Sequence, residues 1–302
     1  MGTLAEMLST PLGVIEWFVY LLAAVMFVIG LHLMNSPKTA RKGNMVSAIG
    51  MVFAVAMAFI VLFAGEASNG FKHGVAVIVL IVGIVIGAVA GVVSAKKVKM
   101  TDMPQLVSVF NTVGGGAAAL VALNDILTSA ETPSIVVLIT AGLGIMIGSV
   151  TFSGSLIAAG KLQGIKWVKK LSLPGKGFWN ILFVVLTIVS FVMLCVQPNQ
   201  RLLWSILTTV FALCYGLVFV IPIGGADMPV VISVLNACTG TAVAMSGLAI
   251  NNIALIVAGA LVGAAGVTLS IAMSKAMNRP LLSVLAGGFG GSNSAAGAGE
   301  GL

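Results

Sequence analysis

The chain is dominated by long apolar stretches, each of the roughly 20 residues that a helix needs to cross the hydrocarbon core of a bilayer. Inside that core each backbone N–H and C=O must be paired within its own segment, so such stretches form helices. We therefore expect an all-α integral membrane protein, a bundle of about nine transmembrane helices. The expected spans are 12–33, 45–64, 74–95, 105–127, 134–159, 178–196, 201–221, 228–249 and 251–275.

The composition excludes a soluble fold. Of the 302 residues 59% are hydrophobic and 8% are charged, whereas a soluble domain carries charge on about a quarter of its residues. The formal net charge of +7 could indicate a nucleic-acid partner, but the placement of the basic residues explains it more simply. We expect no nucleic acid.

Thirteen of the fifteen Lys and Arg residues fall on one side of the predicted bundle, and only Lys72 and Arg201 fall opposite. The positive-inside rule places the richer side in the cytoplasm, together with the C-terminus, and the N-terminus outside. The first segment starts acidic and is apolar for a full membrane width, so we expect it to stay as a helix. The thirteen are Lys38, Arg41, Lys42, Lys96, Lys97, Lys99, Lys161, Lys166, Lys169, Lys170, Lys176, Lys275 and Arg279.

An internal repeat joins two of the predicted spans. TDMPQLVSVFNTVGGGAAALVAL starts at Thr101 and ADMPVVISVLNACTGTAVAMSGL at Ala226, at a constant shift of 125 residues. Both copies begin on the same side, so the repeat is parallel and a shared site between its helices is plausible. Matched pairs are Asp102 with Asp227, Pro104 with Pro229, Ser108 with Ser233, Asn111 with Asn236, and Gly115 with Gly240.

Each copy opens with Asp-Met-Pro at the cytoplasmic face. Proline is tolerated in the first turn of a helix, and the aspartate could cap that helix and favour its positive dipole end. Capping would explain both Asp102 and Asp227. Because Asp227 follows Gly224 and Gly225 in a short loop, it could instead hold a carboxylate against another domain.

Asn111 and Asn236 lie nine residues beyond these aspartates, about 13 Å along the helix axis and well inside the membrane. Polar side chains at that depth face the bundle interior, either as interhelical hydrogen-bond donors or as the lining of a hydrated ion path. Both readings stay open. Neither amide can gain and lose a proton near neutral pH, so a proton path needs water or a titrating residue from elsewhere.

Few other residues indicate chemistry. His32 and His73 fall at predicted membrane surfaces, and Gly259, Gly263 and Gly266 give small-xxx-small spacing for helix packing or a hinge. Walker motifs, nucleophile elbows and metal-ligand spacings are absent from the sequence, and GGFGG after Ala286 lacks the strand that a dinucleotide fingerprint needs. We expect no metal and, from the three cysteines Cys195, Cys214 and Cys238, no disulfide framework.

The sequence resembles the beta subunit of proton-translocating NAD(P) transhydrogenase, specifically its membrane domain, over nearly the whole chain. The stretches that carry the resemblance are MTDMPQLVSVFNTVGGGAAA from Met100, FSGSLIAAGKLQG from Phe152, PIGGADMPVVISVLNACTG from Pro222, GALVGAAG from Gly259 and KAMNRPLLSVLAGGFG from Lys275. The resemblance implies a complex in the plasma (inner) membrane that passes a hydride equivalent from NADH to NADP⁺ while protons move inward. Alone, the chain is expected to catalyse nothing.

The resemblance also implies residue roles. Asn111 matches a position where some members carry a proton-path histidine and where others carry Asn, with the histidine supplied by the alpha subunit. Asn236, together with Ser108 and Ser233, is expected on the same proton path. Asp227 matches a loop aspartate that faces the NADP(H)-binding domain, and Lys275 and Arg279 match the basic end of the last helix, which leads to that domain. These three residues and Asp102 are coupling candidates.

The resemblance further implies the partners. They are an alpha subunit with the NAD(H)-binding domain and membrane helices, and an NADP(H)-binding domain, in a dimer of complexes. The sequence itself divides into a transmembrane domain, 1–286, and a Gly/Ser/Ala-rich linker or tail, 287–302. The NADP(H)-binding domain of the family is not contained in it, so that domain would be a separate chain, or this chain is truncated. NAD(H) and NADP(H) would then bind outside this chain.

Two other function classes compete with this reading. A secondary transporter is compatible with a parallel repeat and polar midplane residues, although the sequence shows neither a membrane-buried charge nor an evident broken helix. A structural subunit would use the asparagines as interhelical bonds and the Asp-Met-Pro turns as caps. Replacing Asn236 by Leu distinguishes the structural reading, which predicts no loss of proton coupling.

Overall fold

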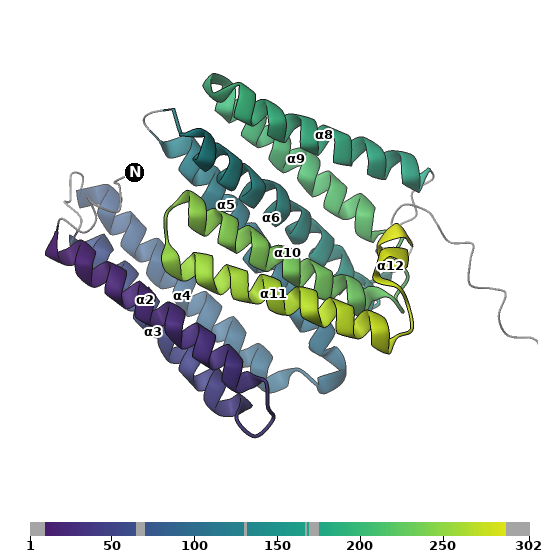
Figure 1. Cartoon of the computed structure of the whole chain (residues 1–302), viewed down its shortest axis with the longest axis horizontal. Helices are drawn as coiled ribbons and strands as arrows, with labels where there is room; N and C mark the ends of the chain where they lie inside the picture. The colour runs from purple at the N-terminus through teal and green to yellow at the C-terminus, as the bar shows by residue number, and fades with distance from the viewer. Residues whose placement is uncertain (1–9, 65–69, 130–131, 167, 169–174, 288–302) are drawn as a thin grey trace, which may run out of the picture. The chain divides into compact units, whose positions relative to one another are not determined.

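The computed structural model describes residues 10–64, 70–129, 132–166, 168 and 175–287, and these residues are helical with short connections (Figure 1). Nine of the helices in this part of the chain are long and apolar enough to cross a membrane. The expected all-α membrane bundle is confirmed. The predicted tail, apart from Gly287, lies outside the described residues.

The chain divides into two compact units, Met1–Met103 and Pro104–Leu302. In the first, α2 (Pro11–Met34), α3 (Ala40–Ala64) and α4 (Gly70–Lys97) are followed by a single 3-10 turn, η1 (Met100–Asp102). Helix α2 begins where proline occupies its first turn and Thr10 accepts a hydrogen bond from the Gly13 amide at 3.1 Å. A side-chain acceptor of this kind satisfies one of the unpaired amides at a helix start.

Glycines allow α2 and α3 to cross closely. A Cβ on Gly30 would lie 2.9 Å from the Gly43 carbonyl oxygen and would meet Ser47, and a Cβ on Gly50 would lie 3.0 Å from the Met26 side chain. Small residues serve the same purpose in membrane helix pairs generally. The first unit therefore has a tightly packed helix pair.

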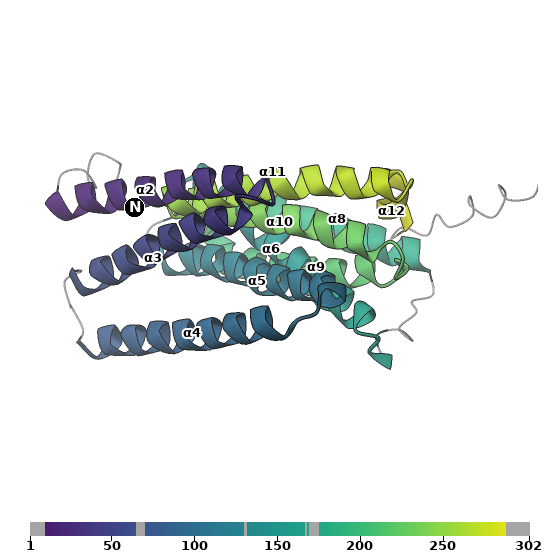
Figure 2. The same cartoon turned by 90° about the horizontal axis from the view of Figure 1, so that it is seen from below.

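Helix α4 lies apart from the α2–α3 pair (Figure 2). None of its most apolar window is buried, and a Cβ added at Gly83, Gly87 or Gly91 would meet no atom within 4 Å. The small residues of α4 thus have the spacing of a packing face, but no described residue of the first unit lies on that face.

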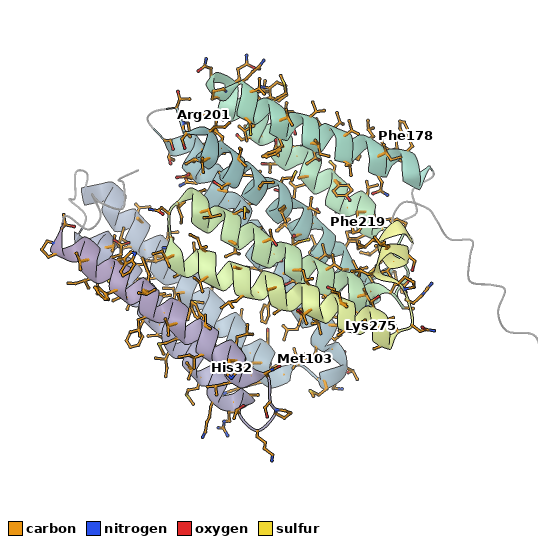
Figure 3. All side chains as sticks on the ribbon, in the orientation of Figure 1. His32, Met103, Phe178, Arg201, Phe219 and Lys275 are labelled. Carbon is orange, nitrogen blue, oxygen red and sulfur yellow. The ribbon has the colours of Figure 1, made fainter. Side chains whose placement is uncertain are left out.

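The second unit contains α5 (Met103–Thr128), α6 (Ile135–Leu162), α8 (Lys176–Val196), the 3-10 turn η2 (Pro198–Gln200), α9 (Arg201–Val220), α10 (Met228–Ala249), α11 (Ile253–Ala276) and the short α12 (Leu281–Gly287). We call the end with Lys161, Lys166, Lys275 and Arg279 the basic end, and the end with Arg201 the far end. Figure 3 shows Lys275 and Arg201 at opposite ends of this unit.

The two repeat helices, α5 and α10, run in the same direction. The Asn111 side chain of α5 meets the Ile232 carbonyl of α10, and farther along both helices the Ser246 hydroxyl of α10 meets the Ala118 carbonyl of α5. These contacts join residues 121 and 128 positions apart, on either side of the repeat shift. The parallel repeat therefore brings matching positions of its two copies to nearly the same level on neighbouring helices.

Several helices end in the same way. After α11, Asn278 adopts a positive φ of 51°, the Arg279 amide donates to the Ser274 carbonyl and the Asn278 amide donates to the Lys275 carbonyl. This is a Schellman ending, in which Asn replaces the usual glycine. Gly164 closes α6 by equivalent bonds. The ending of α11 directs the chain into α12.

Two apolar clusters hold the second unit together, one near each end. The cluster at the basic end contains Ile157 of α6, Phe219 of α9, Met228 of α10 and Val284 of α12. The cluster at the far end contains Ile126 of α5, Leu138 of α6 and Leu194 of α8. The polar residues discussed below lie between the two clusters or at the basic end.

Helix ends differ from the predicted spans by up to five residues, the largest difference being at α3. This helix starts at Ala40 rather than at residue 45, because the polar run Arg41, Lys42, Gly43, Asn44 is already helical. A helix predicted only from its apolar residues is too short when its first turn is polar. The short helix α12 was not predicted, because seven residues are too few to show a clear period.

Candidate proton path and coupling site

The polar seam of the second unit begins with Asn111 of α5. Its side chain is 3% exposed and its amide donates to the Ile232 carbonyl of α10 at 3.3 Å. Ile232 lies one helical turn before Asn236. The repeat thus places its two asparagines on facing helices, and we call the region between them the asparagine seam.

Asn236 is less enclosed than Asn111. It is partly exposed, and its side chain makes no hydrogen bond with any residue that the structure describes. One turn earlier, Ser233 donates to the Gly266 carbonyl at 3.3 Å and accepts from the Ser270 hydroxyl at 3.0 Å. The α10 copy therefore joins α11 through its serine and leaves its asparagine amide available.

The α5 copy joins α6 in a parallel manner. The Ser108 hydroxyl donates to the Ser155 carbonyl at 2.7 Å, just as Ser233 bonds a carbonyl of α11. The Ser155 hydroxyl is fully buried without a partner in the described part of the chain, and so is the Oε1 atom of Gln105, one turn before Ser108. Buried polar atoms generally find a partner, and the described residues supply none to Gln105 Oε1 or to the Ser155 hydroxyl.

Sequence reasoning missed Gln105 and Ser155. Gln105 lies in the first turns of α5, where a polar residue at a membrane surface is ordinary. Ser155 lies among Ser149, Thr151 and Ser153 on α6, and these hydroxyls fall on two opposite faces of the helix, so their spacing does not single out the face toward the seam. The one available signal was the spacing of three between Gln105, Ser108 and Asn111, which places them on one helix face.

Glycine contacts close the helices beyond the asparagines. A Cβ on Gly115 would lie 2.9 Å from the Gly148 carbonyl oxygen of α6, and a Cβ on Gly240 would lie 2.7 Å from the Gly259 carbonyl oxygen of α11. Gly266 is equally close to Ala237, at 2.6 Å from its backbone nitrogen, whereas Gly263 has more space. On the far side of the asparagines the seam is therefore narrow.

An ion pair forms at the basic end. The Arg279 guanidinium donates through Nη2 to Oδ2 of Asp227 at 3.1 Å, with the two side chains 46% and 17% exposed. The second carboxylate oxygen of Asp227, Oδ1, is buried and has no hydrogen-bond partner among the described residues. Asp227 therefore has one carboxylate oxygen that can still accept a hydrogen bond.

The structure does not bring all the predicted coupling residues together. Lys275 is exposed and makes no hydrogen bond or ion pair with the described residues. Asp102 lies in η1 of the first unit, exposed, where it accepts a 3.4 Å hydrogen bond from the Thr101 hydroxyl. Asp227 and Arg279 alone form a pair.

Neither aspartate caps its helix as the sequence pattern suggested. The Asp227 side chain makes no capping bond to α10, and none is made at Asp102, which precedes the start of α5. The reason at Asp227 is its backbone, whose φ of −89° and ψ of −7° are helical rather than extended as in a capping residue. Its carboxylate turns to Arg279 instead.

Titratable side chains are scarce around the seam. His32 lies exposed in the last turn of α2 in the first unit, and the side chain of His73 is outside the described part. The described residues also contain no group of His, Cys, Asp and Glu side chains able to hold a metal ion. The hydroxyls and amides of the seam can pass hydrogen bonds through water, but they cannot store a proton near neutral pH.

Comparison with known proteins identifies the family. The family model of the NAD(P) transhydrogenase beta subunit matches residues 16–301. Two curated relatives named NAD(P) transhydrogenase subunit beta, from Rhodospirillum rubrum and from a strain of that species, are each 39% identical over 287 residues. The alignment covers 93% of this chain and 59% of either relative, so the chain spans less than two thirds of their length. On the family match, this chain belongs to the NAD(P) transhydrogenase beta subunit family.

Proposed function

We propose that this chain forms the membrane part through which a transhydrogenase complex couples hydride transfer from NADH to NADP⁺ with inward proton movement. The asparagine seam is the observation that carries the proposal. Two helices of an internal repeat meet through Asn111, whose amide bonds the Ile232 carbonyl one turn before Asn236, inside the apolar second unit. Polar side chains at such depth are costly and generally serve transport.

The proton path runs from the basic end to the seam in this proposal. Gln105 and Ser155 each leave a buried polar atom without a partner, so water molecules can bridge from the surface to Asn111. Ser108 and Ser233 fix the helices on either side through bonds to neighbouring carbonyls. The tight glycine contacts beyond the asparagines oppose leakage when no proton is being transferred.

A titrating group must come from outside the seam. No amide or hydroxyl in it changes charge near neutral pH, whereas a histidine does. The resemblance implies that members with asparagine at this position receive the histidine from the alpha subunit. We therefore place a helix of that subunit beside Asn236, whose amide makes no bond to the described residues.

Coupling is assigned to the basic end. The Asp227–Arg279 pair belongs to the turn that opens α10 and to the chain just after α11, so its rearrangement would act on the two helices next to Asn236. One elementary charge crossing about 100 mV is worth about 2.3 kcal/mol, within the roughly 1–3 kcal/mol that typically couples two sites. A modest change at this pair is sufficient. Lys275 and Asp102 are secondary candidates.

The proposal includes the partners and the location. An alpha subunit supplies the NAD(H)-binding domain and further membrane helices, an NADP(H)-binding domain faces Asp227, and two such complexes form a dimer in the plasma (inner) membrane. The N-terminus is outside and the C-terminus cytoplasmic, as the distribution of lysine and arginine favours. The described residues contain no strand that could support a dinucleotide-binding turn, so both nucleotides are assigned to domains outside this chain.

One observation favours a purely structural role. The bond from Asn111 to the Ile232 carbonyl is an interhelical contact of the kind that stabilises membrane bundles. Asn236 argues against this role, because its side chain makes no such bond in the described residues. The two readings therefore differ most at Asn236.

Reconstitution tests the proposal. The chain is placed in proteoliposomes with its complete partner subunits, NADH and an NADP⁺ analogue are added outside, and hydride transfer and internal pH are recorded together. Hydride transfer accompanied by a pH change that an uncoupler abolishes is the expected result. Hydride transfer without any pH change, or no transfer by a fully assembled complex, would contradict the proposal.

A further inference from the structure

Lys161, in the last turn of α6, has an unusual set of partners. Its ammonium group donates to the carbonyls of Val220, at 3.3 Å, and of Ile223, at 2.9 Å, and also to the carbonyl of Ile221. An ammonium carries three N–H donors, so it can bind several carbonyls at once. All three carbonyls belong to the end of α9 and the start of the turn that follows it.

The carbonyl groups at the end of α9 are suited to binding a cation. Pro222 has no backbone N–H to continue the helical hydrogen bonds, so α9 ends at Val220 although Ile221 keeps helical angles, φ −54° and ψ −45°. The carbonyls of this last turn therefore lack most of their helical partners, and the Val220 carbonyl accepts a bond from the Ile223 amide at 3.2 Å. The C-terminal end of a helix also carries partial negative charge, which a lysine offsets. A side chain from another helix, α6, supplies what α9 lacks.

The same turn leads directly to Asp227. From Ile223 the chain continues through Gly224 and Gly225, both exposed and with no atom within 4 Å of an added Cβ, to the carboxylate that pairs with Arg279. The connection between α9 and α10 is thus held at two points. Lys161 holds its first residues and Arg279 holds its last.

We propose that Lys161 is a positioning residue for Asp227, which fixes the loop from Ile221 to Asp227 to the end of α6. This inference rests on the proposed function, in which Asp227 faces the NADP(H)-binding domain. Ser155 lies six residues before Lys161 on α6, with its carbonyl bonded to Ser108. Lys161 therefore links the carboxylate at the surface to the helix that borders the asparagine seam.

Spin labelling tests the positioning role without any enzyme assay. Gly225→Cys carries the label, since a side chain there meets no atom and the backbone φ is not positive. The native cysteines Cys195, Cys214 and Cys238 are replaced by Ala. Lys161→Met is compared with Lys161→Arg, which keeps the charge and the donors, and with Lys166→Met, which removes an exposed lysine nearby that makes no bond to the described residues.

The expected result is a shift of the label spectrum toward higher mobility in Lys161→Met, a return toward the parent spectrum in Lys161→Arg, and no shift in Lys166→Met. An unchanged spectrum in Lys161→Met would overturn the inference. If the Met variant does not accumulate in membranes, Lys161→Gln, which keeps two donors on a shorter side chain, is measured in its place against the same criteria.

A second measurement separates this inference from the proposed function. In the complete complex, Lys161→Met is expected to lower coupled hydride transfer about tenfold, a typical size for the loss of coupling between sites, and Lys161→Arg to restore it. A mobile loop with unchanged coupling in both Lys161→Met and Asp227→Asn would support Lys161 as the positioning residue and overturn the coupling role of Asp227.

Discussion

The two copies of the repeat share a sequence pattern but differ in their surroundings. In the α5 copy, Asn111 is buried and bonded to the other copy, whereas Asn236 of the α10 copy is partly exposed and makes no bond to the described residues. At the start of each copy, Asp102 is exposed and bonded only to its neighbour Thr101, whereas Asp227 holds Arg279. Matched positions thus carry the same residue types, but their burial and their bonding partners differ.

In the proposed function, the α5 copy would serve as a scaffold and the α10 copy would be the part that meets partner subunits. Both serines bond a carbonyl of the next helix, Ser108 on α6 and Ser233 on α11. The repeat therefore extends from single helices to helix pairs, α5–α6 and α10–α11.

The largest difference is expected at the matched glycines. Gly240→Ala places a Cβ against the backbone of α11, 2.7 Å from the Gly259 oxygen and closer still to the Gly263 nitrogen. Backbone cannot move as a side chain can, so we expect the upper end, about 3 kcal/mol or more, of the usual overpacking cost in the free energy of unfolding. Gly115→Ala, whose closest neighbours begin at 2.9 Å and include the Thr151 side chain, is expected to cost about 1 kcal/mol. Thermal unfolding in detergent compares them, and equal midpoints would contradict the packing described.

The aspartates should differ next. Asp227→Asn removes the charge that pairs with Arg279, and we expect about a tenfold fall in coupled hydride transfer by the complete complex. Asp102→Asn, at an exposed position, is expected to leave that rate unchanged. Arg279→Gln should match Asp227→Asn, and the double variant should be no worse than either, because both changes break one interaction. Equal losses of coupled hydride transfer in Asp102→Asn and Asp227→Asn would contradict the difference between the two copies.

Stability should distinguish the asparagines. Asn111→Leu loses the bond to the Ile232 carbonyl, and we expect a loss of about 1 kcal/mol in the free energy of unfolding. Asn236→Leu loses no bond to the described residues and should unfold at or above the parent temperature. The measurement is again the thermal midpoint in detergent. A larger loss for Asn236→Leu would mean that Asn236, not Asn111, serves as the interhelical bond.

The smallest effect is expected in α4. Gly87→Ala adds a methyl group to open space and gains helix propensity, so the chain should be unchanged or more stable by up to about 1 kcal/mol. Gly30→Ala, at the crossing of α2 and α3, is the control and should destabilise, because its Cβ meets the Gly43 oxygen at 2.9 Å. A clear loss of stability for Gly87→Ala in the assembled complex, but not in the isolated chain, would show that a partner helix covers this face of α4.

Much of the fold follows from the sequence, because a bilayer permits little besides apolar helices. Nine spans and the repeat could be predicted from apolarity and from a constant shift of 125 residues. The pairing of Asp227 with Arg279 could not be derived from spacing, since 52 residues separate them. The resemblance implies that both residues lie at the cytoplasmic end of the membrane domain, and the structure shows that they form an ion pair.

The remaining features depend on contacts with backbone, which leave no side-chain pattern. Lys161 binds three carbonyls of another helix, and any residue type presents a carbonyl. Ser155 can be recognised only from the packing of α5 on α6, because Ser149, Thr151 and Ser153 nearby on α6 also carry hydroxyl groups. The absence of capping at Asp227 likewise follows from backbone angles that the Asp-Met-Pro pattern does not specify.

The central claim, that the asparagine seam carries protons, is tested most directly by the ratio of protons moved to hydride transferred in proteoliposomes. Asn236→Leu is compared with Asn124→Leu, the same substitution at an exposed position of α5. The account predicts that Asn236→Leu lowers this ratio about tenfold in a complex that assembles normally, while Asn124→Leu keeps it. An unchanged ratio in Asn236→Leu would contradict the claim and leave the seam as a structural contact between the two copies.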